Sequence, residues 1–224
     1  MISIIIPIYN EEEVLRFSTE RLLGLSECTE LIFVDGGSSD KSADIAKEYG
    51  KVLSCEKGRG RQMNVGAREA QNNTLLFLHA DNAISPEVFE NIEKTVCDNG
   101  AVGGCLTQRI ENKRPVFRFI EWQGNSRARR TKVFYGDQGI FVRKDVFERI
   151  GGFPVVPIFE DVLFTQKLRR EGKTTVLPDK IMVSARRWEK RGILRTTVMF
   201  SWFLTMFKMG YPLEKIKKLH EDLR

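Results

Sequence analysis

Three short stretches place acidic side chains where apolar sequence gives way to polar sequence. They are Tyr9-Asn10-Glu11-Glu12, Val34-Asp35-Gly36-Gly37 and Phe159-Glu160-Asp161. Asp and Glu are rarely buried unless they are paired or bind something, and α/β proteins hold ligands at the carboxyl ends of their strands. Carboxylates at such ends can accept hydrogen bonds from hydroxyl groups, hold a divalent cation or take a proton from a reacting group. The three stretches therefore predict one shared site.

Basic residues are the second set of candidates, because the chain carries a net charge of +6. They cluster at residues 57–61, 127–132, 186–187 and 215–218. Such clusters attract phosphates, nucleic acid or anionic lipid without choosing among them. Around Gly58 and Gly60 the backbone amides can approach a phosphate, which the guanidinium groups of Arg59 and Arg61 can bind in a forked geometry. An exposed turn is the alternative for this segment.

The elements that must position these residues alternate between strand and helix over the first hundred residues. Apolar, β-branched runs predict strands at 2–8, 31–34, 52–54 and 74–78. Helix start and stop signals predict helices at 11–25, 41–49, 62–70 and 85–98. This alternation predicts a Rossmann-like α/β fold with a mixed, mainly parallel sheet flanked by helices. The carboxyl ends of the strands then carry Tyr9, Asp35, the 57–61 loop and His79-Ala80-Asp81-Asn82.

The second half of the chain is less regular. Strands are predicted at 103–110, 139–143, 176–177 and 181–184, and helices at 117–130, 145–150 and 161–170. Residues 193–211 have a strongly apolar core of about a dozen residues, short of the roughly 20 that a membrane-spanning helix needs. Because basic residues flank this segment, an amphipathic helix at a membrane surface is one of two interpretations. The alternative is a helix that packs on the domain or on a second subunit.

Composition narrows the class of protein. Hydrophobic residues make up 42% of the chain and charged residues 29%, which indicates a soluble protein with a real core. Four cysteines without CxxC spacing argue against a zinc site or a disulfide framework. Met1 leads straight into a strand-like run without a basic leader or cleavage site, which predicts a cytoplasmic protein. Peripheral attachment to the inner face of the cell membrane is left open.

Four segments, in order within residues 2–190, resemble the motifs of the family 2 glycosyltransferases. Residues 3–12 are similar to the opening strand with its P-x-Y/L-N-E end, 34–40 to the V-D-D/G-G-S-x-D segment, 78–82 to the acidic metal motif and 159–161 to the E-D motif. Segments 59–64 and 184–188 look closer to a bacterial subgroup of uncharacterised members. The resemblance implies the GT-A fold in a single domain over 1–224. Its parts would be a nucleotide-binding half at about 1–105, an acceptor half at 106–190 and an amphipathic helical tail at 191–224.

The resemblance also implies roles for most of the candidates. The nucleoside would be held by strand-end residues, namely Pro7, Tyr9, Glu11 and Asp35. By their chemistry, later residues would hold the diphosphate, namely Arg59, Arg61, Arg186 and Arg187, and Trp188 could stack on the sugar. Asp137 would line either the acceptor pocket or the donor-sugar pocket. Simpler roles stay open: Glu11 as a charge at a helix N-terminus, Asp35 as a cap for the following turn, and residues 186–188 as a basic surface beside a core Trp.

The same resemblance implies a metal site and a catalytic base. Asp81 matches a metal ligand of the family, and Mg²⁺ or Mn²⁺ is often held by one or two carboxylates together with substrate phosphates. His79 replaces the first acid of that motif, either as a ligand of Mn²⁺ or as a histidine satisfied at a strand end. Asp161 matches the base that deprotonates the acceptor hydroxyl and gives inversion at the anomeric carbon. Glu160 would orient Asp161 or the acceptor.

The predicted function is therefore an inverting glycosyltransferase that moves a sugar from a UDP- or GDP-sugar to an acceptor hydroxyl. A lipid-linked acceptor and a homodimer are left open, and no nucleic acid partner is expected. One alternative is a nucleotidyltransferase on a related fold, although the acidic segment 9–13 would repel a triphosphate. Another is a non-enzymatic basic protein that binds nucleic acid or lipid surfaces, although such a protein has no use for Asp81, Glu160 and Asp161.

Overall fold

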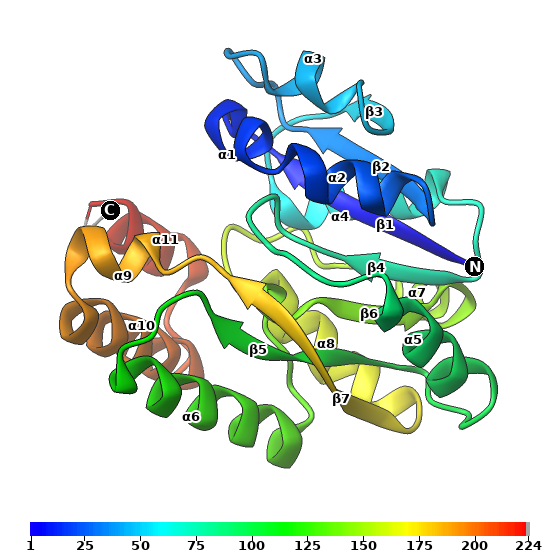
Figure 1. The fold of residues 1–224 in the computed structure, drawn as a ribbon. Coiled ribbons are helices and arrows are strands. Elements are labelled where there is room, and N and C mark those ends of the chain that lie inside the picture. Colours follow the sequence, from blue (N-terminus) through cyan, green and yellow to red (C-terminus); the bar gives the residue numbers. More distant parts are fainter. Residues whose placement is uncertain (223–224) are drawn as a thin grey trace.

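The computed structural model describes residues 1–222, with all of their side chains except those of Arg187, Lys190, Glu221 and Asp222. Seven strands of this part of the chain form one sheet (Figure 1). The order across the sheet is β3 (Lys51–Ser54), β2 (Glu30–Asp35), β1 (Ile2–Ile8), β4 (Thr74–Phe77), β6 (Ile140–Arg143), β5 (Gly103–Ile110) and β7 (Thr174–Val183). β6 is antiparallel to its neighbours β4 and β5, and the other pairs are parallel. The predicted mixed, mainly parallel sheet is confirmed.

Helices connect the strands and cover both faces of the sheet (Figure 1). In chain order they are α1 (Glu12–Phe17), α2 (Thr19–Ser26), α3 (Ser42–Ala46), α4 (Arg59–Glu69), α5 (Glu87–Cys97), α6 (Pro115–Thr131), α7 (Lys144–Ile150), α8 (Glu160–Glu171), α9 (Arg186–Arg191), α10 (Ile193–Lys208) and α11 (Leu213–Asp222), with a 3₁₀ helix η1 (Gly136–Gln138) between α6 and β6.

Several predicted boundaries are wrong for local reasons. The helix predicted at 11–25 is two helices, because Ser18 has φ −106° and ψ 8° and so leaves helical geometry. The two strands predicted at 176–177 and 181–184 are one strand, β7, which runs through Pro178. Proline is tolerated there because β7 lies at the edge of the sheet. The helix predicted from residue 62 begins at Arg59, directly after Gly58.

The core lies on both faces of the sheet, as expected for strands buried on each side. Successive residues of β1 point to opposite faces, so Ile4 belongs to the cluster under α2 and α5, and Ile5 to the cluster under α4, α7 and α8. The second cluster contains closely packed aromatic rings, with the centroids of the tilted rings of Phe153 and Phe164 4.3 Å apart. This packing fixes the loop between α7 and α8 against the sheet.

The C-terminal tail folds back onto the rest of the chain. Phe203 and Met206 of α10 and Ile216 of α11 pack with Phe159 and Val162 at the start of α8. The inner face of α10 therefore packs on the domain, which is one of the two arrangements predicted. Within the described part of the chain, no helix combines the length and the apolarity that a membrane span requires. The division into nucleotide and acceptor halves stays a prediction.

Candidate functional site

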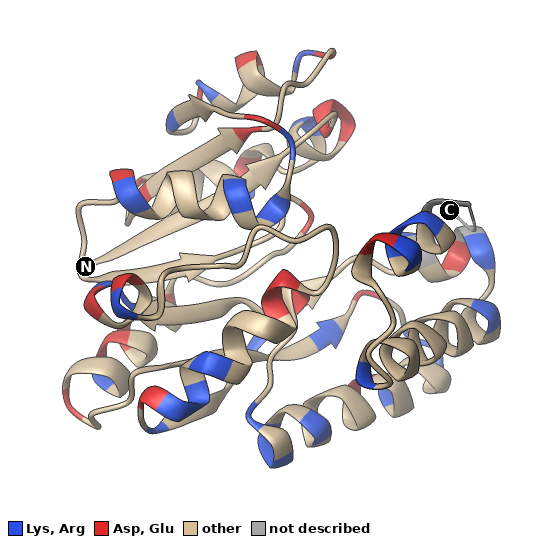
Figure 2. Cartoon of the chain, turned by 180° about the vertical axis from the view of Figure 1, so that it is seen from behind, with Lys and Arg blue, Asp and Glu red and all other residues tan. Residues whose placement is uncertain are grey.

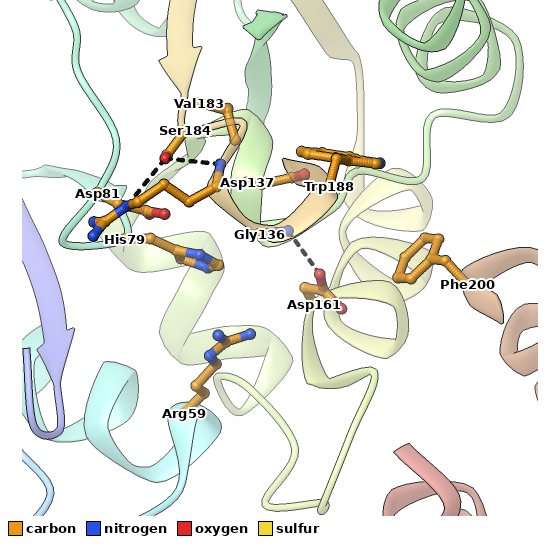
Figure 3. Close-up of a pocket in the computed structure, with 11 residues that line it drawn as sticks. Arg59, His79, Asp81, Gly136, Asp137, Asp161, Val183, Ser184, Trp188 and Phe200 are labelled. Atoms are coloured by element: carbon orange, nitrogen blue, oxygen red, sulfur yellow. Dashed lines mark hydrogen bonds between the residues drawn. The ribbon is translucent and has the colours of Figure 1, made fainter. Parts of the chain in front are cut away.

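The ends of β4 and β7, the 3₁₀ helix η1 and the starts of α4 and α8 meet around a cavity of about 130 Å³ (Figure 3). All of these elements meet at the carboxyl edge of the sheet, where parallel strands leave room for a ligand. The cavity is lined by Arg59, His79, Asp81, Gly136, Asp137, Asp161, Val183, Ser184, Arg186, Trp188 and Phe200. Seven of these were predicted as site residues from the sequence, namely Arg59, His79, Asp81, Asp137, Asp161, Arg186 and Trp188.

Asp161 lies in the first turn of α8 and points into the cavity (Figure 3). Its Oδ2 accepts a hydrogen bond from the Gly136 N–H at 2.6 Å, and its Oδ1 accepts one from its neighbour Val162 N–H at 2.7 Å. Burial raises the pKa of Asp161, whereas these two backbone donors and the charge of Arg59 lower it. The net shift is upward, so the carboxylate is a stronger base than an exposed Asp.

Glu160 is buried beside Asp161 and does not line the cavity. Burial, and then the charge of Asp161, raise the pKa of Glu160, and the charge of Arg59 opposes them. The chain reaches this pair through Phe159, which has φ +66° and ψ 25°, a left-handed conformation that non-glycine residues rarely adopt. The backbone at the start of α8 is thus held in an unusual geometry next to two adjacent carboxylates.

Gly136 separates His79 from Asp161. A Cβ atom on Gly136 would lie 2.8 Å from Nε2 of His79 and 3.5 Å from Oδ2 of Asp161. A side chain at this position would therefore displace the imidazole, and glycine lets the η1 backbone approach both groups. The sequence analysis missed this residue, although the Gly136-Asp137-Gln138-Gly139 segment was the available signal.

The loop that carries Asp81 is fixed by two contacts. Asn82 is buried, and its Oδ1 accepts a hydrogen bond from the His79 N–H at 2.9 Å. Arg21 of α2 donates from Nη2 to the Ala80 carbonyl oxygen at 2.6 Å. Burial lowers the pKa of Arg21, and the negative charge of Asp81 opposes that shift. Arg21 thus supplies positive charge behind Asp81, a tertiary contact that no sequence motif signalled.

The residues present fit a divalent cation that arrives with a diphosphate. Asp81 and His79 line the same cavity, so one carboxylate and one imidazole face it. Among the described residues, no three His, Cys, Asp or Glu side chains gather closely enough to hold a metal ion by themselves. Mg²⁺ commonly takes one or two carboxylates and completes its octahedron with substrate phosphates and water. The weakened acidic motif is consistent with that mode.

Other predicted phosphate ligands differ in their surroundings. Arg186 lines the cavity, and its Nε lies 3.4 Å from Oγ of Ser184. Arg61 forms an ion pair with Glu56 and does not line the cavity. The side chain of Arg187 lies outside the described residues. Asp137 accepts a hydrogen bond at Oδ2 from Nε2 of Gln108 at 2.7 Å, which orients its carboxylate in the cavity.

The predicted nucleoside residues lie at the ends of β1 and β2, outside this cavity. Ile8 and Asp35 are paired residues of the two parallel strands, so Pro7, Tyr9, Glu11 and Asp35 are neighbours. The Asp35 carboxylate accepts hydrogen bonds from the Gly37 and Ser38 N–H groups and from the Ser38 hydroxyl, which is the turn cap left open by the sequence. The ring of Tyr9 lies under the Lys57 ammonium, 3.8 Å from its centroid. Their nucleoside roles stay predictions.

Helix α4 braces both parts of the site through two side chains that the sequence analysis did not single out. Gln62 is buried and donates from Nε2 to the carbonyl oxygens of Ile8 and Val34, each at 2.8 Å. Asn64 exchanges two hydrogen bonds with the backbone of Phe153, both at 2.8 Å. Gln62 thus ties the ends of β1 and β2 together, and Asn64 holds the loop that leads to Glu160 and Asp161.

Comparisons with known proteins identify the family of the chain. A sequence model described as "Glycosyl transferase family 2" matches residues 3–154. The chain is 33% identical over 130 residues to an undecaprenyl-phosphate 4-deoxy-4-formamido-L-arabinose transferase of Photorhabdus laumondii, covering 52% of this chain and 39% of the relative. It is 34% identical over 113 residues to the minor teichoic acid biosynthesis protein GgaA of Bacillus subtilis, covering 44% and 25%. The chain thus spans less than half the length of these relatives.

Solved structures share the fold at low sequence identity. The crystal structure of S. aureus TarS 1-349 in complex with UDP-GlcNAc superimposes with a TM-score of 0.67 and 22% identity, covering 82% of this chain and 58% of that one. The mannosyltransferase PcManGT of Pyrobaculum calidifontis, in complex with GDP-Man and Mn²⁺, gives a TM-score of 0.63 and 19% identity, covering 81% and 56%.

Proposed function

Because the chain belongs to glycosyl transferase family 2 and has the GT-A fold, we propose that it transfers a sugar from a nucleoside diphosphate to an acceptor oxygen in the cavity. One observation carries this proposal: Asp81, Asp161, Arg59 and Arg186 come from distant parts of the chain and line a single cavity. The predicted family and fold are confirmed. The mechanism and the roles of individual residues are the proposal.

Asp161 is the proposed general base. The acceptor hydroxyl gives its proton to the Asp161 carboxylate while its oxygen bonds to the anomeric carbon, and the bond between that carbon and the diphosphate oxygen breaks. Attack opposite the leaving group inverts the anomeric carbon. The raised pKa of Asp161 supports this role, because a base works best when its pKa approaches the working pH. Gly136 and Val162 orient the carboxylate through their N–H groups.

The departing diphosphate needs positive charge around it. Arg59 and Arg186 line the cavity and are the proposed cationic ligands of the phosphates, because guanidinium groups bind phosphate oxygens in a forked geometry. Asp81, with His79 beside it, would hold a Mg²⁺ or Mn²⁺ ion that neutralises the developing charge. Trp188 offers an aromatic face to the sugar, and its ring is held edge-on by Phe117 with the centroids 6.0 Å apart.

The donor is proposed to be a UDP- or GDP-sugar, and the acceptor a lipid-linked alcohol. TarS has been crystallised with UDP-GlcNAc and the Pyrobaculum enzyme with GDP-Man and Mn²⁺, which supports both nucleotide classes and a divalent cation. The Photorhabdus relative is named for an undecaprenyl-phosphate acceptor, which supports the lipid-linked class.

A panel of nucleoside diphosphates tests the proposal directly. Thermal unfolding is measured with UDP, GDP, ADP and CDP, each with Mg²⁺, with Mn²⁺ and with a chelator. A ligand that binds only the folded protein adds about 2.7 kcal/mol of stability at a concentration of a hundred times the ligand's Kd, and so raises the melting temperature of the protein. We expect one diphosphate to stabilise the chain far more than the others, and more with metal. No shift with any diphosphate contradicts sugar transfer. A larger shift with the matching nucleoside triphosphate, measured in the same way, together with release of pyrophosphate in a separate assay, favours nucleotidyl transfer.

A further inference from the structure

The outer face of α10 is apolar and exposed. Leu194, Val198 and Trp202 follow one another at intervals of four residues, which places them on one side of the helix. Their exposed fractions are 77%, 58% and 47%. The opposite side of α10 packs on the domain through Phe203 and Met206. The exposed residues therefore form a stripe that nothing in the described part of the chain covers, and we call it the α10 stripe.

The formal charges of α10 itself are of one sign, although the helices packed against it, α9 and α11, carry the exposed acids Glu189 and Glu214. α10 contains no Asp or Glu, and its formal charges are Arg195 and Lys208, both exposed. The neighbouring helix α6 has a single acidic residue, Glu121, which is buried and paired with Arg109 and Arg118. Figure 2 shows Lys and Arg along these two helices and almost no Asp or Glu. An apolar stripe with basic flanks is the pattern of a helix that lies in the interface of an anionic bilayer.

We propose that the α10 stripe docks the protein on an anionic lipid surface. Trp202 suits the boundary between head groups and acyl chains, where Trp is enriched. Arg195 and Lys208 would reach the lipid phosphates from the two ends of the helix. A second copy of this chain is a poorer occupant, because pairing two such faces would bring cations of like sign together.

The docked orientation has a consequence for the cavity, which rests on the proposed function. Phe200, from the same helix, lines the cavity and packs on Tyr135 with the ring centroids 5.6 Å apart. A helix that contacts lipid on one side and the cavity on the other brings the cavity close to the lipid surface. A lipid-linked acceptor could then enter from the bilayer while its chain stays in the membrane.

Sedimentation with vesicles tests the docking. The full chain is mixed with phosphatidylglycerol vesicles and with phosphatidylcholine vesicles at low and at physiological salt. We expect binding to the anionic vesicles, weakened by salt, and about a tenfold weaker partition for Val198→Glu and for the double variant Arg195→Glu, Lys208→Glu. Phe17→Glu on α1 is the matched apolar control, because Phe17 is 83% exposed. The double variant Lys167→Glu, Arg170→Glu on α8 is the matched charge control, because both residues are exposed and the change in net charge equals that of Arg195→Glu, Lys208→Glu. Both controls should bind like the wild type.

Two results overturn the docking. The first is equal partition of wild type and Val198→Glu, or no sedimentation of the wild type with anionic vesicles. The second is a dimer of the wild type in light scattering that Val198→Glu converts to a monomer, since that assigns the stripe to a second copy. The thermal shift with nucleoside diphosphates is measured on each variant in parallel. A retained shift without vesicle binding refutes only the docking, and vesicle binding without any shift refutes only the sugar transfer.

Discussion

Replacing Asp161 by Asn removes the proposed base at nearly constant volume. A positioned general base contributes about 10²–10⁴ to a rate, and each factor of ten corresponds to about 1.4 kcal/mol of barrier. The variant should therefore raise the activation barrier that sets kcat by about 3–5 kcal/mol. An amide has one acceptor oxygen, so either the Gly136 or the Val162 N–H loses its partner, at a cost of about 1–3 kcal/mol of stability. Loss of the buried charge offsets part of this cost, because burial raises the pKa of Asp161.

The assay follows release of nucleoside diphosphate at saturating donor, with donor affinity measured separately by calorimetry. We expect Asp161→Asn to fold, to keep the donor Kd within about threefold and to lose at least a hundredfold in kcat. In the wild type, kcat/KM should rise with pH and level off above the raised pKa of Asp161, and the residual activity of the variant should lack this rise. Glu171→Gln, an exposed acid-to-amide change on the same helix, is the control. Turnover of Asp161→Asn within tenfold of that control refutes the assignment of the base.

Three further predictions follow from the same contacts. Glu160→Gln should stabilise the fold, and by more at pH 8 than at pH 4. The pKa of Glu160 in the folded protein is raised, so the folded state loses stability as the pH rises from the ordinary pKa of Glu through this raised pKa, and the amide avoids that loss. A change in melting temperature that is equal at both pH values contradicts this. Asp81→Ala should abolish the extra thermal shift that Mg²⁺ or Mn²⁺ gives a nucleoside diphosphate and keep the metal-independent shift; an unchanged metal effect removes Asp81 from the metal site. Asn64→Leu should lower the free energy of unfolding by about 2–4 kcal/mol in urea titration, because both backbone groups of Phe153 lose their partner; an unchanged urea midpoint shows that the clamp is dispensable.

The sequence predicted the first half of the fold better than the second. Strands β1, β2 and β4 are runs of apolar, β-branched or aromatic residues, and such runs identify buried strands without knowledge of their neighbours. The placement of β6 between β4 and β5, antiparallel to both, is a tertiary choice that no local pattern encodes. β7 was split in two because Pro178 interrupts its apolar pattern, although an edge strand tolerates that residue.

The candidate site was predictable where strand ends and motif order determine position. Asp81 and Asp161 follow recognisable segments, and the structure brings them into one cavity with Arg59 and Arg186. Gln62, Asn64 and Arg21 were missed because they act through hydrogen bonds to distant backbone, and a polar residue on a helix gives no sign of which carbonyl it will meet. Gly136 was missed for a related reason, since the need for glycine arises only when His79 and Asp161 approach it from both sides.

The cavity holds three carboxylates, and their surroundings argue for different tasks. Asp81 has the half-buried Arg21 guanidinium behind its loop, and its proposed task is to hold the cation that accompanies a diphosphate. Asp137 is oriented by Gln108, which suits a group that accepts hydrogen bonds from a sugar. Asp161 is the one whose two oxygens are fixed by backbone N–H groups while burial raises its pKa, so its geometry is rigid and its affinity for a proton is increased. A rigid carboxylate with increased proton affinity is what deprotonating an alcohol requires, and this is why the base is assigned to Asp161 rather than to its neighbours.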